Sequence, residues 1–206
     1  MTDGAKFRVW WVVALFAATA AGCGGGVAVV EQPQYAPPPQ ESSSLKTPDQ
    51  ALLKDALQGQ SISPVEAANL SDRMLADEIA TFQDDKNMAR LEILLYKALK
   101  TQDKQARPRL LRNLGIIHYH QKQYKRARQE LQQANELNPK DARTHFYLAR
   151  LFAHQSNIYL AQGKKQISQQ QAKRADIEMQ HARKLEPSNP LYRQNLAETL
   201  QQERGK

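Results

Sequence analysis

Residues 111–139, LRNLGIIHYHQKQYKRARQELQQANELNP, decide the fold of this chain. Apolar and small side chains recur there at helical spacings in two blocks, which are separated by the polar residues 121–123. The second block ends at Asn138-Pro139, because proline cannot continue a helix. The stretch therefore predicts two helices joined by a short turn, and the positions that carry the pattern are Leu114, Ile117, Tyr124, Ala127, Leu131 and Ala134.

A glycine interrupts the first of these blocks. Gly115 lies inside the predicted helix, where glycine costs about 1 kcal/mol relative to alanine. A glycine retained at such a position indicates that another part of the backbone packs too close for a side chain. We therefore expect the second helix to lie directly against Gly115.

The whole stretch resembles a tetratricopeptide repeat. That family has a large residue, Leu-Gly, an aromatic residue, a small residue, a second aromatic residue, alanine and a closing proline at fixed spacing. This chain departs from the family at three places. Leu111 replaces the usual tryptophan, and His118 and Leu131 replace the two aromatic residues. The resemblance implies stacked helical hairpins, with His118 packed where an aromatic side chain usually lies, and it rests on Leu111, Leu114, Gly115, His118, Ala127, Leu131, Ala134 and Pro139.

Composition and charge agree with a helical domain. The chain has 206 residues, enough for one domain with a modest core beside targeting and linker segments. From Thr47 onward it is rich in Ala, Leu, Gln, Lys, Arg and Glu, which favour helices. The formal net charge of +8 is compatible with nucleic acid, an anionic membrane surface or an acidic protein as partner. The N-terminal leader makes nucleic acid the least expected of these.

Residues 1–22 read as an export signal. Lys6 and Arg8 precede an uncharged apolar run over residues 9–21, which is short for a membrane span. Residues 20–23, Ala-Ala-Gly-Cys, resemble the lipobox of bacterial lipoproteins, and Cys23 is the only cysteine in the chain. We favour a signal peptide over residues 1–22 with lipidation of Cys23. Cleavage after Ala20 and an uncleaved anchor that extends through Val30 remain alternatives.

The resemblance to lipoproteins implies a place in the cell. Gly24 after the cysteine is similar to sequences sent to the outer membrane, so we expect an acylated (palmitate-bearing) protein that faces the periplasm. Glycine, proline and serine dominate residues 24–46, which together with Cys23 form the predicted lipidated tether, residues 23–46. Its prolines favour an extended conformation of about 3.1 Å per residue.

Three further helices are predicted before the repeat. Thr47-Pro48 starts one over residues 48–58, and Ser63 with Glu66 forms a capping box before one over residues 64–82. Asp84-Asp85 marks the start of a third, over residues 86–101. We interpret residues 47–101 as degenerate N-terminal helices that complete the stack.

A second, longer hairpin is predicted after Pro139. The repeat pattern returns over residues 142–162 and 165–186, but its second half arrives 14 residues late, so each helix gains about two turns. Gly163 would lie at the tip, with Ile158, Leu160 and Ile167 closing the extension. Residues 190–202 resemble one more first helix, the cap of the stack. The fold class is thus an all-α, short solenoid of tetratricopeptide-like hairpins over residues 107–206, preceded by the signal, the tether and the degenerate helices.

A binding groove is implied by the family resemblance. Tetratricopeptide repeats hold ligands in a groove lined by the first helix of each repeat, and carrying those places over gives a cationic surface with aromatic side chains. Such a surface suits an acidic peptide or helix, and the alternative is a solvated charged face. The predicted groove residues are Arg109, Arg112, Ile116, Tyr119, His120, Arg143, Phe146, Arg150 and His154.

No catalytic or metal motif was found, and no cofactor is predicted. The five histidines form no HExxH or Cys/His spacing, and no nucleophile motif or phosphate-binding loop is present. The sequence therefore predicts a protein that is not an enzyme but an envelope-anchored scaffold for protein partners, with pilus or secretion assembly and cell-wall maintenance as expected settings. The alternative is binding of an anionic polymer or membrane surface through the basic face.

Overall fold

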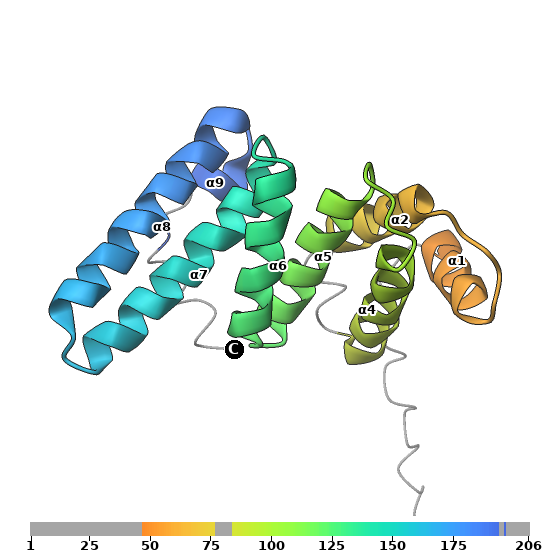
Figure 1. Ribbon diagram of the computed structural model, residues 1–206, viewed down its shortest axis with the longest axis horizontal. Coiled ribbons are helices and arrows are strands. Elements are labelled where there is room, and N and C mark those ends of the chain that lie inside the picture. The colour runs from red at the N-terminus through yellow and green to blue at the C-terminus, as the bar shows by residue number, and fades with distance from the viewer. Residues whose placement is uncertain (1–46, 77–83, 194–195, 197–206) are drawn as a thin grey trace, which may run out of the picture. The chain divides into compact units, whose positions relative to one another are not determined.

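The computed structural model describes residues 47–76, 84–193 and 196 (Figure 1). Every regular element in these residues is an α-helix, as predicted. The predicted signal, Cys23, the tether, the end of the helix expected to reach residue 82 and most of the expected capping helix lie outside the described residues. The helices are α1 Thr47–Leu57, α2 Pro64–Ala76, α4 Asp85–Leu99, α5 Arg107–His120, α6 Tyr124–Leu137, α7 Ala142–Ala161, α8 Lys165–Leu185 and α9 Pro190–Arg193.

Side-chain caps begin α2 and α4 as the sequence predicts. The Ser63 amide donates to Glu66 Oε2 at 2.8 Å, and the Glu66 amide donates to Ser63 Oγ at 3.2 Å, which is a reciprocal capping box. Asp84 accepts hydrogen bonds from the Lys86 and Asn87 amides at the start of α4. Both caps satisfy amides that have no partner inside a helix.

The first hairpin, α5 with α6, confirms the close approach expected at Gly115. A Cβ built on Gly115 would lie 2.6 Å from Leu131 Cγ and 3.2 Å from the Ala127 carbonyl oxygen. Ala127, Leu131 and Ala134 are all buried on the face of α6 that meets α5. The glycine is therefore required by the neighbouring helix, against its own low helix propensity.

The second hairpin, α7 with α8, is longer. These helices have 20 and 21 residues, whereas α5 and α6 have 14 each, and Figure 1 shows α7 and α8 side by side along their length. The expectation that Ile158, Leu160 and Ile167 close the extension is wrong, because these side chains are 40–55% exposed. The inner positions belong to Ser156 and Ser168, whose hydroxyl oxygens lie 3.0 Å apart.

Helix α5 is central to the packing of the described residues. It contacts α2, α4, α6 and α7, and one hydrophobic cluster extends from α1 through α8 to Tyr192 in α9. The ring of Tyr192 lies 5.0 Å from that of Phe146 in α7. Among the described residues, no helix is both long and apolar enough to cross a membrane.

His118 occupies the place of an aromatic residue, as expected, but brings charge into the core. Its side chain is fully buried, with Nδ1 2.5 Å from Glu130 Oε2 in α6 and Nε2 3.2 Å from Glu92 Oε1 in α4. Burial acts to lower the pKa of His118, but its contacts with Glu130 and Glu92 outweigh this effect and raise the pKa. The His118 ring thereby links α5 to α6 and α4.

Candidate functional site

The nine predicted groove residues come from α5 and α7, two helices that contact each other. Most of these side chains are buried or half-buried. Ile116 is fully buried and Phe146 is 3% exposed, so both belong to the core and offer a partner very little surface. The structure therefore brings the two predicted rows together, but packs much of them inside the protein.

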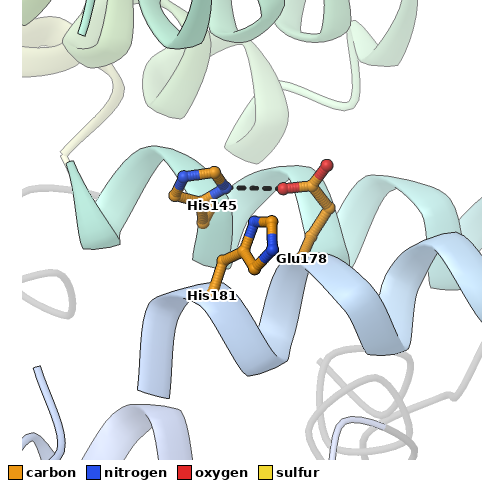
Figure 2. A group of neighbouring side chains, drawn as sticks. All are labelled: His145, Glu178 and His181. Atoms are coloured by element: carbon orange, nitrogen blue, oxygen red, sulfur yellow. Dashed lines mark hydrogen bonds and ion pairs between the residues drawn. The ribbon is translucent and has the colours of Figure 1, made fainter. Parts of the chain in front are cut away.

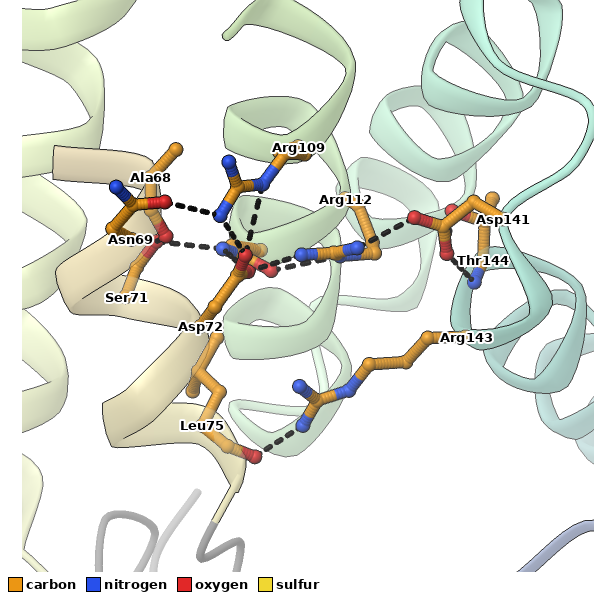
Figure 3. Close-up of polar contacts among 11 residues, drawn as sticks. Ala68, Asn69, Ser71, Asp72, Leu75, Arg109, Arg112, Asp141, Arg143 and Thr144 are labelled. Atoms are coloured by element: carbon orange, nitrogen blue, oxygen red, sulfur yellow. Dashed lines mark hydrogen bonds and ion pairs between the residues drawn. The ribbon is translucent and has the colours of Figure 1, made fainter. Parts of the chain in front are cut away.

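Arg109 and Arg112 converge on one carboxylate, that of Asp72 in α2 (Figure 3). Arg109 Nε donates to Asp72 Oδ2 at 2.9 Å, and Arg112 donates both to Asp72 and, at 2.5 Å, to Asp141 Oδ2. Asn113 Nδ2 completes the set by donating to Asp72 Oδ1 at 2.7 Å. We call these five residues the Asp72 network, which ties α2 to α5 and to the start of α7.

The Asp72 network is electrostatically favourable. Burial acts to raise the pKa of Asp72, but Arg112, Asn113 and Arg109 together lower it below its ordinary value. Burial likewise opposes the charge on Arg112, and the carboxylates of Asp141 and Asp72 outweigh that effect and raise its pKa. The positive charge that the sequence offered to a partner is therefore balanced by carboxylates of the same chain.

Arg143 and Arg150 of α7 are held differently. Arg143 donates to the carbonyl oxygen of Leu75 at the end of α2. The Arg150 guanidinium lies 4.8 Å from the ring centroid of Tyr119 and 5.1 Å from that of Tyr147. Only 4% of Arg150 is exposed, so its cation–π contacts are made in a desolvated setting.

The two groove histidines lie among aromatic rings. His120 Nε2 is 3.2 Å from the Tyr147 hydroxyl, and the His154 ring centroid is 4.1 Å from that of Tyr124. Burial, Arg150 and Arg143 lower the pKa of His120 to about 3. His120 is therefore neutral at pH 7 and adds no charge to this surface.

A pocket of about 460 Å³ opens where the end of α2, α5, the start of α7, the segment after α8 and α9 meet. We call it the α7 pocket, because residues at the start of that helix line it. Three predicted groove residues take part, and the lining carries charges of both signs, so the pocket is not uniformly basic. Its lining includes Arg112, Arg143 and Phe146 from the predicted groove, with Asp72, Lys140, Asp141, Glu186, Leu191 and Tyr192.

Sequence reasoning missed both carboxylates of the Asp72 network. Asp141 had a readable signal, because it directly precedes the apolar run of α7 and caps that helix through the Thr144 amide at 2.9 Å. Asp72 had no such signal in the sequence, because the residue that donates to it, Arg112, is 40 positions away.

A second cluster, His145, Glu178 and His181, was also missed (Figure 2). It joins α7 to α8, and the structure places one possible metal-ligand atom from each residue within 4.8 Å of the others. The spacing Glu178-x-x-His181 was a signal, because residues three apart lie on one face of a helix. We call these residues the His145 cluster.

Comparison with known families agrees with this architecture. The family described as Tetratricopeptide repeat matches residues 108–141, which contain nearly all of α5 and the whole of α6. No curated protein and no solved structure matches the chain. This repeat fold typically binds proteins and is typically not catalytic, and no enzyme family is indicated. The chain is therefore a protein that contains a tetratricopeptide repeat.

Proposed function

We propose that this chain is an adaptor of the bacterial cell envelope, anchored by a lipid on Cys23, whose helical stack binds a protein partner. Binding of protein partners is the general role of tetratricopeptide repeats, which supports the scaffold function. The lipobox-like residues 20–23 and the basic, apolar leader support the anchor, and Gly24 after the cysteine supports an outer-membrane location facing the periplasm.

The observation that carries the binding proposal is the α7 pocket. It places Arg143, Lys140 and apolar surface from Leu191 together at one opening beside the matched repeat. Lys140 and Leu191 are exposed at this rim. An acidic peptide or helix with one apolar side chain suits this combination, because the lysine attracts the carboxylates and the leucine provides contact area.

The Asp72 network determines which substitutions can test this proposal. Arg112→Glu would place a third carboxylate beside those of Asp72 and Asp141 and would destabilise the fold. A loss of binding in that variant could therefore result from unfolding and would not test the pocket. The informative change is Lys140→Glu, at an exposed position on the rim. Lys173→Glu on the exposed face of α8 is the matched control, since it alters the charge equally away from the pocket.

The test uses photo-crosslinking of the full chain in its own cells. A crosslinker at position 140 is expected to capture a partner that one at position 173 does not. The acidic segment of that partner should then bind the purified Lys140→Glu variant at least about tenfold more weakly than wild type. Its affinity for the Lys173→Glu variant should equal that for wild type. Equal binding by both variants would reject the pocket.

The lipid anchor is tested separately. The full chain should partition into the detergent phase, and the Cys23→Ser variant should not.

A second candidate function, binding of an anionic surface, is favoured by the tip of the second hairpin. Ile158, Leu160 and Ile167 are exposed there next to Lys164 and Lys165, a combination that suits anionic lipid head groups. Replacing residues 155–171 with Gln-Lys-Gln, the turn of the first hairpin, removes this tip. Binding to anionic vesicles that falls steeply with salt and disappears in that variant would support this candidate over the adaptor.

A further inference from the structure

The His145 cluster combines two imidazoles with one carboxylate on two adjacent helices (Figure 2). His145 comes from the first turn of α7, while Glu178 and His181 come from the last two turns of α8. The three side chains converge at the base of the long hairpin, away from the turn at Gly163.

His145 is already oriented as a metal ligand would be. Its Nε2 lies 2.9 Å from the Pro139 carbonyl oxygen and donates a hydrogen bond to it, so Nδ1 is directed at the Glu178 carboxylate, 2.6 Å away. Histidines that bind metals usually donate their other ring N–H to a carbonyl or carboxylate, which fixes the ring. The Pro139 carbonyl performs this task here, and a bound ion would take the place of the proton that Nδ1 now shares with Glu178, releasing that proton to solvent.

The cluster combines a fixed ligand with two adjustable ones. His145 is 4% exposed, Glu178 is half-buried, and His181 is exposed, so an ion in solution can reach the site from the side of His181. Ligand atoms around a tetrahedral Zn²⁺ lie about 3.3 Å apart. The three ligand atoms now lie within 4.8 Å of one another, so binding requires the side chains to adjust to this spacing. The ring of His181 stands edge-on to that of His145, with centroids 5.0 Å apart.

We propose that His145, Glu178 and His181 form a binding site for a divalent transition metal ion, with Zn²⁺ as the best fit. Two imidazoles and one carboxylate are a ligand set that Zn²⁺ accepts, whereas Mg²⁺ and Ca²⁺ prefer oxygen ligands throughout. Three protein ligands leave a fourth position for water or for a group of a bound partner. The ion would link α7 to α8 and so stabilise the long hairpin.

The test is a calorimetric titration of the untagged full chain with ZnCl₂, in a Cys23→Ser background that removes the only cysteine as a competing ligand. Three variants are compared with this parent: His181→Ala and Glu178→Gln, which each remove a ligand, and the control His154→Ala. His154 lies against Tyr124, outside the cluster. Thermal unfolding with and without Zn²⁺ gives an independent readout.

We expect one Zn²⁺ per chain, and affinity at least about tenfold weaker in His181→Ala and Glu178→Gln but unchanged in His154→Ala. Saturating Zn²⁺ should raise the Tm of the parent by several degrees and that of His181→Ala by much less, while Mg²⁺ has no effect on either. Absence of binding at about 100 μM Zn²⁺, or equal affinity in the parent and His181→Ala, would overturn the proposal.

Discussion

Hairpins α5/α6 and α7/α8 follow one repeat pattern with different residues at the same places. The first has Gly115 opposite Leu131, and the second has Ala149 and Met179 at the corresponding, buried positions. Leucine branches at Cγ and leaves no room for a methyl group, whereas unbranched methionine adapts to its neighbour. The repeat pattern therefore requires a small residue at this place, and the side chain opposite it decides how small that residue must be.

The hairpins also differ in how their first helices meet the neighbours. In α5, Arg112 is held by the carboxylates of Asp72 and Asp141. In α7, the Arg150 guanidinium lies against the rings of Tyr119 and Tyr147. The first hairpin therefore depends on paired charge, and the second on aromatic packing, so substitutions in the two should differ in cost and in pH dependence.

Asp72→Asn is expected to have the largest effect, a loss of about 3 kcal/mol in the free energy of unfolding at neutral pH. It leaves the buried Arg112 without one of two carboxylates, and breaking such a pair costs about 3–5 kcal/mol. The low end applies because the Asp72 side chain is 27% exposed and Arg112 keeps Asp141. Urea unfolding measures the difference, with Asp176→Asn on the exposed face of α8 as control.

The same variant has a defined pH signature. Because the pKa of Asp72 is lowered in the folded state, its stabilising contribution is complete above the ordinary Asp pKa of about 4 and is lost as the pH falls through the lowered value. Wild type should therefore lose more stability than Asp72→Asn on acidification. Parallel acid-unfolding curves for the two proteins would contradict the Asp72 network.

His118→Phe tests the buried charge within the first hairpin itself. The raised pKa of His118 means that its contribution is complete below its unfolded pKa of about 6.5 and is lost as the pH rises through the raised value. The groups that face it are Glu130 from α6 and Glu92 and Tyr96 from α4. We expect a loss of roughly 2 kcal/mol near pH 6, the size of a charged hydrogen bond.

The difference between His118→Phe and wild type should shrink as the pH rises toward 9. His120→Phe should show the opposite trend, because the folded pKa of His120 is lowered to about 3 while its unfolded state still binds protons below about 6.5, so wild type gains stability relative to this variant as the pH rises. Stability measured by urea unfolding at several pH values gives both curves. A constant difference for His118→Phe would show that the histidine acts through its shape and not its charge.

Gly115→Ala should cost about 1 kcal/mol. The new methyl group would overlap Leu131 and approach the Ala127 carbonyl oxygen. Such overpacking typically costs about 1–3 kcal/mol. The higher helix propensity of alanine offsets about 1 kcal/mol of this cost. In a Leu131→Met background, which copies the second hairpin, the same change should cost less. A double-mutant cycle without coupling between positions 115 and 131 would reject this explanation.

The sequence predicted the helices well because the signals that define them are local. Helical spacing, the Ser63 capping box, Asp84 and Pro139 each act within a few residues of an end. The delayed repeat pattern likewise anticipated the length of α7 and α8. Such features need no knowledge of which helices become neighbours.

The candidate site was predicted less completely because its chemistry depends on residues distant in sequence. The repeat pattern correctly placed Arg109 and Arg112 on the first helix, but gave no indication that Asp72, 37 and 40 positions earlier, would accept both. The His145 cluster likewise required α8 to bring Glu178 beside His145, 33 positions away. Hydrophobic periodicity identifies which face of a helix is buried, but it does not identify which charged residues of other helices will lie against that helix.

The turns of the two hairpins support the smallest prediction. Lys122 has φ 61° in the first turn and Gly163 has φ 74° in the second, so both occupy the left-handed region, where glycine is less strained than lysine. Lys122→Gly should therefore stabilise the protein by about 0.5 kcal/mol, since relief of strain exceeds the greater chain entropy of glycine. Gly163→Lys should destabilise it by a similar amount. The midpoints of urea unfolding measure both, and if Lys122→Gly lowers the midpoint, the side chain of Lys122 contributes more than its backbone strain costs.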